Sequence, residues 1–300
     1  MPQPQQPRHW MSRTLSIRTV LLAFLATSVL VSSASAQKES LLHSFCKQST
    51  CPDGENPYAG LIFDTEGNLY GTASQGGKND GGTVFKATPS GKLSVLHRFC
   101  SGGFPCADGA LPYAGLVLDK KGNLYGTTNE GGTYGGGTLF KVTTAGKESV
   151  LYSFCAQGGF ACTDGEAPFA GLVFDTKGNL YGTTSGGGAY GGGAVFKVTP
   201  AGKESVLYSF CAQGGGTCTD GESPYAGLVF DKSENLYGTT YSGGTYGKGT
   251  VFKITPSGQE TVLYSFCSQS NCTDGSSPFA GLVFDSQGTC MGQPSWAGLT

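Results

Sequence analysis

Residues 168–210 read PFAGLVFDTKGNLYGTTSGGGAYGGGAVFKVTPAGKESVLYSF, and this segment contains one copy of each motif on which the predicted architecture depends. Its parts recur along the chain, and the opening block PFAGLVFD has counterparts beginning at Pro57, Pro112, Pro224 and Pro278. Counted from these prolines, the complete units cover 57–111, 112–167, 168–223 and 224–277. Such constant spacing indicates one structural unit copied in tandem.

Each unit reads as four short strands joined by tight turns. In the fourth unit the strands are expected at Ala226–Phe230, Asn235–Thr240, Thr250–Thr255 and Thr261–Phe266. The first turn carries Asp-x-x-Gly-Asn and the last carries Pro-x-Gly, where glycine supplies positive φ and proline fixes φ. A parallel β-helix has shorter coils without hairpin turns. The sequence therefore predicts an all-β fold, a β-propeller with four-stranded antiparallel blades of about 55 residues.

The composition excludes several other classes of protein. Glycine is the commonest residue, with 50 copies, and only 13% of the residues are charged. Coiled coils and long surface helices need many more charged residues and alanines. A net charge of −2 gives no electrostatic reason to bind nucleic acid or an anionic membrane.

Residues 1–36 have the pattern of a secretory signal peptide. Three arginines precede the apolar stretch Val20–Val31, which is too short to span a bilayer comfortably, and the small residues ASA follow at 34–36. An uncleaved N-terminal anchor is the alternative. No later segment is apolar enough to be a transmembrane segment of the mature chain, so we expect export to the periplasm, cell surface or outside of the cell. Residues 37–56 are then expected to form an outer strand and the first cysteine loop.

Eleven cysteines form five closely spaced pairs and one remainder. Each pair follows the last strand of a unit and precedes an Asp-Gly, which predicts disulfides within single repeats in an oxidising, exported location. A zinc site is the alternative, but pairs on successive blades lie too far apart to share a metal. The predicted pairs are Cys46 with Cys51, Cys100 with Cys106, Cys155 with Cys162, Cys211 with Cys218, and Cys267 with Cys272.

Motifs that could support catalysis or ligand binding are better explained by structural roles of the same residues. We expect no catalytic residues, no metal and no cofactor. His43 and His97 take the place of a strand tyrosine in other units. The glycine-rich loops lack the following helix of a dinucleotide site. The Asp-Gly of each cysteine loop indicates a turn, with calcium ligation as the alternative. Aspartates at the end of each first strand are expected to make Asx-turns. They are Asp64, Asp119, Asp175, Asp231 and Asp285.

Tyr134, Tyr190 and Tyr246 are the candidate binding residues. Each lies in the middle of a glycine-rich loop between the second and third strands of its unit, where the strand core does not need a ring. The structural interpretation is that each ring packs on the next blade or covers a disulfide. The functional interpretation is a stacking platform for a sugar or a peptide.

Strand direction places these features on one face. The second-to-third and fourth-to-first connections of a four-stranded unit lie on the same rim, and the tight turns lie on the opposite rim. We therefore expect the tyrosine loops and cysteine loops to share a rim, as ligand-carrying loops on a rigid scaffold often do.

The repeat resembles known families. PYAGLVLD (112–119) followed by GNLY (122–125) looks like the blades of NHL-type propellers, and GNLYGTT followed by GTVFKVTPxG and VLYSF resembles the GloVer tandem repeat. GloVer repeats occur in exported bacterial proteins described as "choice-of-anchor". The resemblance covers essentially everything after the signal peptide and implies export and repeat architecture. It implies no established activity, and this chain shows no recognisable C-terminal anchor.

Three functions are consistent with this sequence. The first is a non-catalytic binding or surface-interaction module, whose interchangeable copies suit weak contacts added by multivalency to an extracellular glycan or peptide. The second is a polysaccharide-active hydrolase or lyase, which would need one repeat with unique charged residues in a loop. The third is a structural component of the cell envelope.

The fifth unit, 278–300, departs from the repeat after Gly288. The chain continues TCMGQPSWAGLT, but one adenine inserted after the Gly288 codon lets the back-translated tail read NLYGTT, two free positions and GGTY, as at 235–246. This agreement predicts a frameshifted tail, in which Cys290 is not a designed thiol and Trp296 is not a binding residue. The last blade should then lack its second and third strands, so the ring is incomplete and Leu41–Phe45 is an outer strand with little to pair with. Exposed strand edges favour association.

Overall fold

The computed structural model describes residues 40–285 and 290–292. The chain divides into two units, Met1–Leu41 and Leu42–Thr300, and the description below concerns the second. The predicted signal peptide and Trp296 lie outside the described residues. Within the described ranges, no helix has the length and hydropathy to cross a membrane.

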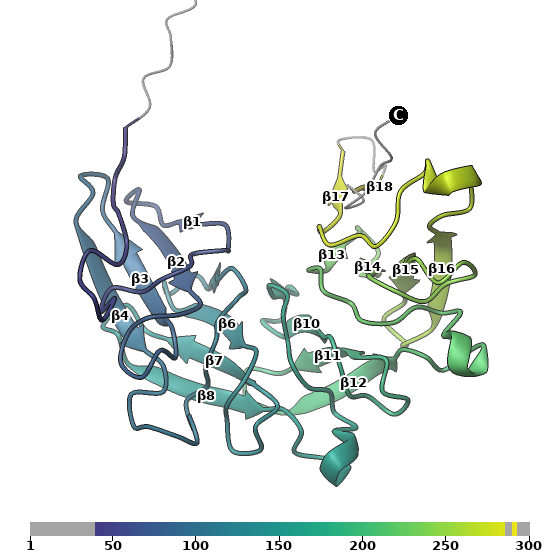
Figure 1. Ribbon diagram of the computed structural model, residues 1–300, viewed down its shortest axis with the longest axis horizontal. Coiled ribbons are helices and arrows are strands. Elements are labelled where there is room, and N and C mark those ends of the chain that lie inside the picture. The colour runs from purple at the N-terminus through teal and green to yellow at the C-terminus, as the bar shows by residue number, and fades with distance from the viewer. Residues whose placement is uncertain (1–39, 286–289, 293–300) are drawn as a thin grey trace, which may run out of the picture. The chain divides into compact units, whose positions relative to one another are not determined.

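The second unit contains four four-stranded antiparallel sheets, each made by one repeat, and one two-stranded sheet, which confirms the predicted all-β blades (Figure 1). Within every blade the strands follow chain order. The first two blades contain β1 (Ile62–Phe63), β2 (Leu69–Ala73), β3 (Thr83–Ala87), β4 (Leu93–Arg98), β5 (Val117–Leu118), β6 (Leu124–Thr128), β7 (Thr138–Val142) and β8 (Glu148–Ser153). The next two contain β9 (Val173–Phe174), β10 (Leu180–Thr184), β11 (Ala194–Val198), β12 (Glu204–Ser209), β13 (Val229–Phe230), β14 (Leu236–Thr240), β15 (Thr250–Ile254) and β16 (Glu260–Ser265).

Two predictions about the ends of the described chain were wrong. The fifth repeat forms a two-stranded sheet of β17 (Val283–Phe284) and β18 (Cys290–Met291), so part of the second strand is present. The pairing of Phe284 with Cys290 matches that of Phe230 with Leu236 one repeat earlier. Residues 40–46 form no strand, because the fourth strand of a blade pairs with the third and no described third strand faces them.

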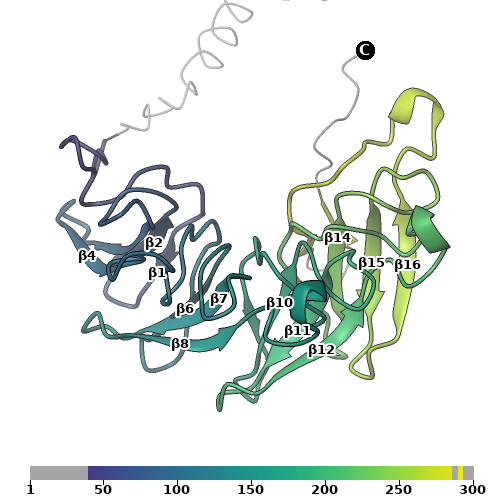
Figure 2. The ribbon, with the colours of Figure 1, turned by 60° about the horizontal axis from the view of Figure 1, so that its bottom comes forward.

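Complementary side chains fix the register inside each blade. Gly182 of β10 lies opposite Phe196 of β11, and a Cβ on this glycine would lie 2.6 Å from Cζ of that ring. The β11–β12 register shifts between Val195 and Phe196, a bulge that recurs in all four blades. Figure 2 shows β10, β11 and β12 side by side in one sheet. The GNLYGTT motif therefore encodes a strand whose central glycine accommodates a large ring.

Neighbouring blades are joined by one phenylalanine contact and one hydrogen bond that repeat along the chain. Phe154, after β8, packs against Phe196 with ring centroids 4.9 Å apart, and both side chains are fully buried. The Thr183 hydroxyl donates to the Ala226 carbonyl of the next blade at 3.4 Å. The Phe99–Phe140 and Phe210–Phe252 contacts repeat the aromatic pair at 4.9 Å. These contacts form an apolar core at each blade junction.

Short helices and turns close the blades. Single 3₁₀ turns occupy three cysteine loops as η1 (Gly159–Ala161), η2 (Gly215–Thr217) and η3 (Ser270–Cys272). At the opposite ends of the strands, the Asp175 carboxylate accepts backbone N–H groups of Lys177 and Asn179, which makes the expected Asx-turn. The Tyr181 hydroxyl also donates to this carboxylate at 3.1 Å. Asp64, Asp119 and Asp231 make the same contacts.

Candidate functional site

The three tyrosine loops are the glycine-rich connections Gly131–Gly137, Gly187–Gly193 and Gly243–Gly249. In the second of them, the Gly188 N–H donates to the Cys162 carbonyl at 3.0 Å and the Gly193 carbonyl accepts the Phe210 N–H at 2.9 Å. The Ala189 N–H donates to the Ser209 hydroxyl at 3.1 Å. The backbone is thus held on both sides of the tyrosine, which makes the loop a rigid support.

The tyrosines project from these loops into solvent. Tyr134, Tyr190 and Tyr246 are 56%, 60% and 51% exposed. At least half of each side chain is therefore open to solvent. In the first repeat Asn79 takes the tyrosine position, and its side chain donates to the Cys100 carbonyl. Exposed rings on anchored loops have the geometry of a stacking surface.

The loop glycines fix this geometry. Comparing alanine substitutions at two of them separates the destabilisation by a backbone clash from the destabilisation by positive φ alone. Gly187 has a φ of +69°, and a Cβ there would lie 2.5 Å from the Cys162 carbonyl oxygen. Gly191 has a φ of +82°, but a Cβ there would meet no atom within 4 Å. We expect Gly187→Ala to lower stability by roughly 2–4 kcal/mol, through positive φ and a backbone clash. Gly191→Ala, the control, should cost about 1–2 kcal/mol. Equal losses in urea unfolding would contradict the clash.

The tyrosine loops and the cysteine loops share a rim, as strand direction predicted. The hydrogen bond from Gly188 to Cys162 joins the two loops directly. Equivalent bonds run from Gly132 to Cys106 and from Gly244 to Cys218. In the structure each predicted cysteine pair is joined, four of them within single repeats and Cys46–Cys51 in the segment before the first repeat. The rim therefore carries a tyrosine and an ordered disulfide loop at each of three successive repeats.

The aspartate of each cysteine loop orders the loop from within. Asp164 is buried, and its carboxylate accepts the Tyr152 hydroxyl at 2.7 Å and the N–H groups of Ala156 and Gln157. These donors occupy the carboxylate, so the contacts support the turn interpretation over calcium ligation. His97 reaches Asp108 with Nε2 at 3.0 Å, as the tyrosines do in later repeats. The histidines thus replace a structural tyrosine, and His43 does the same with Asp53.

Three glutamates have carboxyl groups whose pKa is raised well above the ordinary value, and sequence reasoning missed them. Glu148, Glu204 and Glu260 begin the fourth strands, and the Oε1 atom of each is buried without a hydrogen-bond partner. Burial raises the pKa of each carboxyl to about 7. The Asp164 charge raises the pKa of Glu204 further, and the Tyr152 hydroxyl opposes this. The other oxygen of Glu204, Oε2, accepts the Gln157 side chain of the preceding blade at 3.4 Å, so this carboxyl lies in a contact between blades.

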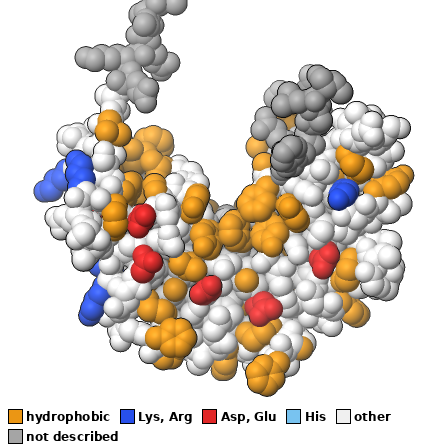
Figure 3. Space-filling model, viewed as in Figure 1, with side chains coloured by type: hydrophobic (Ala, Val, Ile, Leu, Met, Phe, Trp, Pro, Cys, Tyr) orange, Lys and Arg blue, Asp and Glu red, His pale blue; other side chains and the backbone are white. Residues whose placement is uncertain are grey.

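A second aromatic feature, the central aromatic cluster, was also missed. It consists of the residue after the first proline of every repeat, Tyr58, Tyr113, Phe169, Tyr225 and Phe279. The Tyr113 and Phe169 rings stack at 4.8 Å, and those of Tyr225 and Phe279 stack at 5.1 Å. Tyr58 is 71% exposed and Phe279 is 47% exposed. Figure 3 shows hydrophobic side chains gathered in the middle of the face viewed.

The cluster lies on the same rim as the tyrosine loops. Tyr241, the first residue after β14, contacts Tyr225 with ring centroids 5.6 Å apart. The end of β14 is also where its tyrosine loop begins. The aromatic residue after each proline was visible in the sequence, but the first strand was expected to begin one residue later, at Ala226, and the ring was given no role. The rim therefore presents a central group of rings and three peripheral tyrosines.

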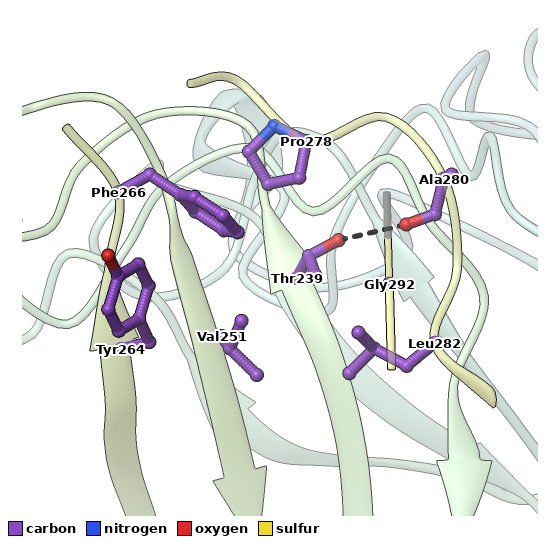
Figure 4. Close-up of a pocket in the computed structure, with 8 residues that line it drawn as sticks. All are labelled: Thr239, Val251, Tyr264, Phe266, Pro278, Ala280, Leu282 and Gly292. Atoms are coloured by element: carbon purple, nitrogen blue, oxygen red, sulfur yellow. Dashed lines mark hydrogen bonds between the residues drawn. The ribbon is translucent and has the colours of Figure 1, made fainter. Parts of the chain in front are cut away.

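A small cavity beside β17 belongs to blade packing. Its volume is about 220 Å³, and the lining side chains include Val251, Phe266 and Leu282 (Figure 4). The Thr239 hydroxyl donates to the Ala280 carbonyl at its edge, as at other blade junctions. Phe266 corresponds to Phe154, whose partner is the phenylalanine on the third strand of the next blade. No described residue of the fifth repeat supplies that ring. The cavity therefore lies at the position that the phenylalanine of the next blade fills at the other junctions.

The carboxylates near the disulfides do not make a metal site in this state. Cys155, Cys162 and Glu166 bring ligand atoms within 4.8 Å of one another, and Cys46, Cys51 and Glu55 do the same. In both groups the two sulfurs are bonded to each other, so no thiolate is available. Zinc binding would require the reduced protein.

Solved structures resemble the chain only distantly. A provisionally assigned gluconolactonase has 15% identity and a TM-score of 0.47, with 79% of this chain and 71% of that chain covered. A provisionally assigned glucose dehydrogenase from Thermus thermophilus has 14% identity and a TM-score of 0.40, with coverages of 79% and 90%. An endo-arabinase from Bacteroides thetaiotaomicron has 16% identity and a TM-score of 0.40, with coverages of 83% and 91%.

Sequence comparison gives the family. A search of curated protein sequences found no match. The Gloeobacter/Verrucomicrobia repeat matches the chain twice, at residues 29–161 and 159–298, which together span the repeats identified above. The period, the four-stranded blades and this match agree, and the chain belongs to the Gloeobacter/Verrucomicrobia repeat family.

Proposed function

We propose that this protein is an exported, non-catalytic binding module. It binds glycan chains on the rim that carries the loop tyrosines and the central aromatic cluster. The single observation that carries the proposal is the placement of Tyr134, Tyr190 and Tyr246. Their rings are more than half exposed, stand on anchored glycine loops and recur at the same position in successive blades. The apolar faces of sugar rings stack on such side chains, and little conformational entropy is lost when the loop is already ordered.

Repetition supports a polymeric ligand. One exposed ring contributes only about 0.5–1.5 kcal/mol of stacking energy. Several such contacts on one rigid scaffold turn later binding events into intramolecular ones, and avidity can then exceed the single-site affinity by about 10²–10⁴-fold. A polysaccharide offers many equivalent sugar rings to equivalent tyrosines. The central aromatic cluster adds apolar surface on the same rim.

The described side chains support binding more than catalysis. The carboxyl groups with raised pKa are packed between blades, and the loop aspartates are occupied by backbone and tyrosine donors. Export is supported by the five cysteine pairs, which need an oxidising compartment. The repeats therefore suit a module that works outside the cytoplasm.

A glycan array read together with a reducing-end assay tests this function. We expect retention of the protein on one polysaccharide class without release of new reducing ends. The variant Tyr134→Ala/Tyr190→Ala/Tyr246→Ala should lose retention at least tenfold, because the stacking surface is removed. The control Tyr134→Phe/Tyr190→Phe/Tyr246→Phe keeps the rings and should keep most of the retention. Hydrolysis of the retained glycan, or unchanged retention by the alanine variant, would contradict the proposal.

A further inference from the structure

A groove of about 620 Å³ lies on the rim opposite the tyrosines, between the second and third blades. It is formed by the turns after β5 and β9 together with Tyr125 of β6 and Lys141 of β7. Its apolar wall contains Tyr125 and Phe174, whose rings meet edge to face at 5.3 Å. The groove is thus separate from the binding surface proposed above and has its own aromatic wall.

The groove has an excess of positive charge. Four lysines line it, Lys120, Lys121, Lys141 and Lys177, against the two aspartates Asp119 and Asp175. The aspartates are engaged in their own turns: Asp119 accepts N–H groups of Lys121 and Asn123 and the Tyr125 hydroxyl. Among the described residues the ion pairs involve only histidine and aspartate, so none of the four ammonium groups is neutralised by one.

The equivalent positions at the neighbouring junctions are balanced in charge. Between the first and second blades, Glu66 takes the position of a lysine, and three lysines face three carboxylates. Between the third and fourth blades, Glu234 takes the position of a glycine, and three lysines again face three carboxylates. The excess at the second junction is therefore a departure from the repeat, in a chain with only 13% charged residues.

We infer that this groove binds an acidic oligosaccharide, with sugar carboxylates near the lysines and a sugar face against the aromatic wall. Lysine ammonium groups attract carboxylates without demanding one geometry, which suits a flexible chain of uronate residues. Exposed Lys120, Lys121 and Lys177 surround the opening, while Lys141 lies over the Tyr125 ring at 5.6 Å from its centroid. Charge and apolar surface thus occur together, which a simple ion-binding surface would not need.

Calorimetric titration with tetragalacturonate tests this inference. We expect Lys121→Gln/Lys177→Gln to weaken binding about five- to tenfold, the effect of losing two exposed charge pairs. Lys147→Gln/Lys203→Gln makes the same change in net charge at exposed turns of the same rim outside the groove, and should bind like the wild type. The triple tyrosine-to-alanine variant should also bind normally, so the two proposed sites can fail independently.

Two further probes decide the chemistry of the ligand. Fully methyl-esterified tetragalacturonate has the same sugars without charge and should bind at least tenfold more weakly. Inorganic phosphate at equal concentration should not displace tetragalacturonate. Equal binding of the esterified probe, displacement by phosphate, or equal losses in the two lysine variants would each overturn the inference.

Discussion

Reduction of the five disulfides is expected to unfold the protein at temperatures where the oxidised form is folded. The pairs are separated by only five to seven residues, and the chain-entropy relation gives about 2 kcal/mol for a loop of this length. Natural domains have a total stability of roughly 5–15 kcal/mol, so losing all five is comparable to the whole. The cysteine loops also anchor the tyrosine loops, through the bond from Gly188 to Cys162.

Thermal unfolding followed by circular dichroism measures this effect. The experiment starts from Cys290→Ser, so that the eleventh cysteine cannot exchange with a disulfide. We expect complete reduction to lower the Tm by more than about 10 °C. The double variant Cys155→Ser/Cys162→Ser, which lacks one pair, should show a fraction of that fall. An unchanged Tm, with full reduction verified by mass after alkylation, would show that the loops do not depend on their disulfides.

Replacing Glu204 and Glu260 by glutamine is expected to stabilise the protein at pH 8 and to change little at pH 5. Burial raises the pKa of both carboxyls from 4.5 to about 7. A raised pKa in the folded state means that folding favours the protonated form. The stabilisation is complete below the pKa of the unfolded chain and is lost as the pH rises through about 7. Glutamine copies the neutral carboxyl and removes this loss.

The size of the effect follows from the burial of the two carboxyls. A shift of this size would correspond to about 3 kcal/mol per group without screening. Both side chains are partly exposed, so we expect on the order of 1 kcal/mol each. The wild-type Tm should then fall by roughly 5 °C between pH 5 and pH 8, and the double variant should lose most of that fall.

Two choices of residue isolate the effect of Glu204 and Glu260 on the pH dependence of stability. Glu148 is left unchanged because its pKa also depends on the charges of His97 and Asp108. Glu130→Gln, at an exposed position, is the matched control and should leave the pH profile as it is. If the double variant kept the wild-type pH dependence, the buried glutamates would not be its source.

The fold was largely predictable because the sequence pattern of each strand occurs in several repeats. Turn residues marked the hairpins, and β14 and β15 lie within one residue of their expected bounds. The first strand was predicted too long, since Val229–Phe230 are its only paired residues. Ala226 instead accepts the Thr183 hydroxyl of the preceding blade. That contact depends on how blades pack, which a pattern within one repeat does not contain.

In the candidate site, too, features within one repeat were predictable and contacts between blades were not. The loop tyrosines were visible because they interrupt glycine runs, and their rim followed from strand direction alone. The glutamates were not found, because their environment comes from another blade: the Gln157 side chain donates to Glu204 at 3.4 Å across 47 positions. A glutamate recurring before SVLYS or TVLYS was the available signal. The lysine groove likewise requires two turns from different repeats to be brought together.

Stepwise removal of Tyr134, Tyr190 and Tyr246 tests whether equivalent rings bind one glycan chain together. Retardation in an affinity gel containing the array-selected polysaccharide would be measured for Tyr190→Ala, Tyr134→Ala/Tyr190→Ala and the triple variant. We expect the apparent dissociation constant to rise by a similar factor at each step, about two- to tenfold per ring. Complete loss of retardation after one substitution, or none after three, would contradict binding by the three rings together.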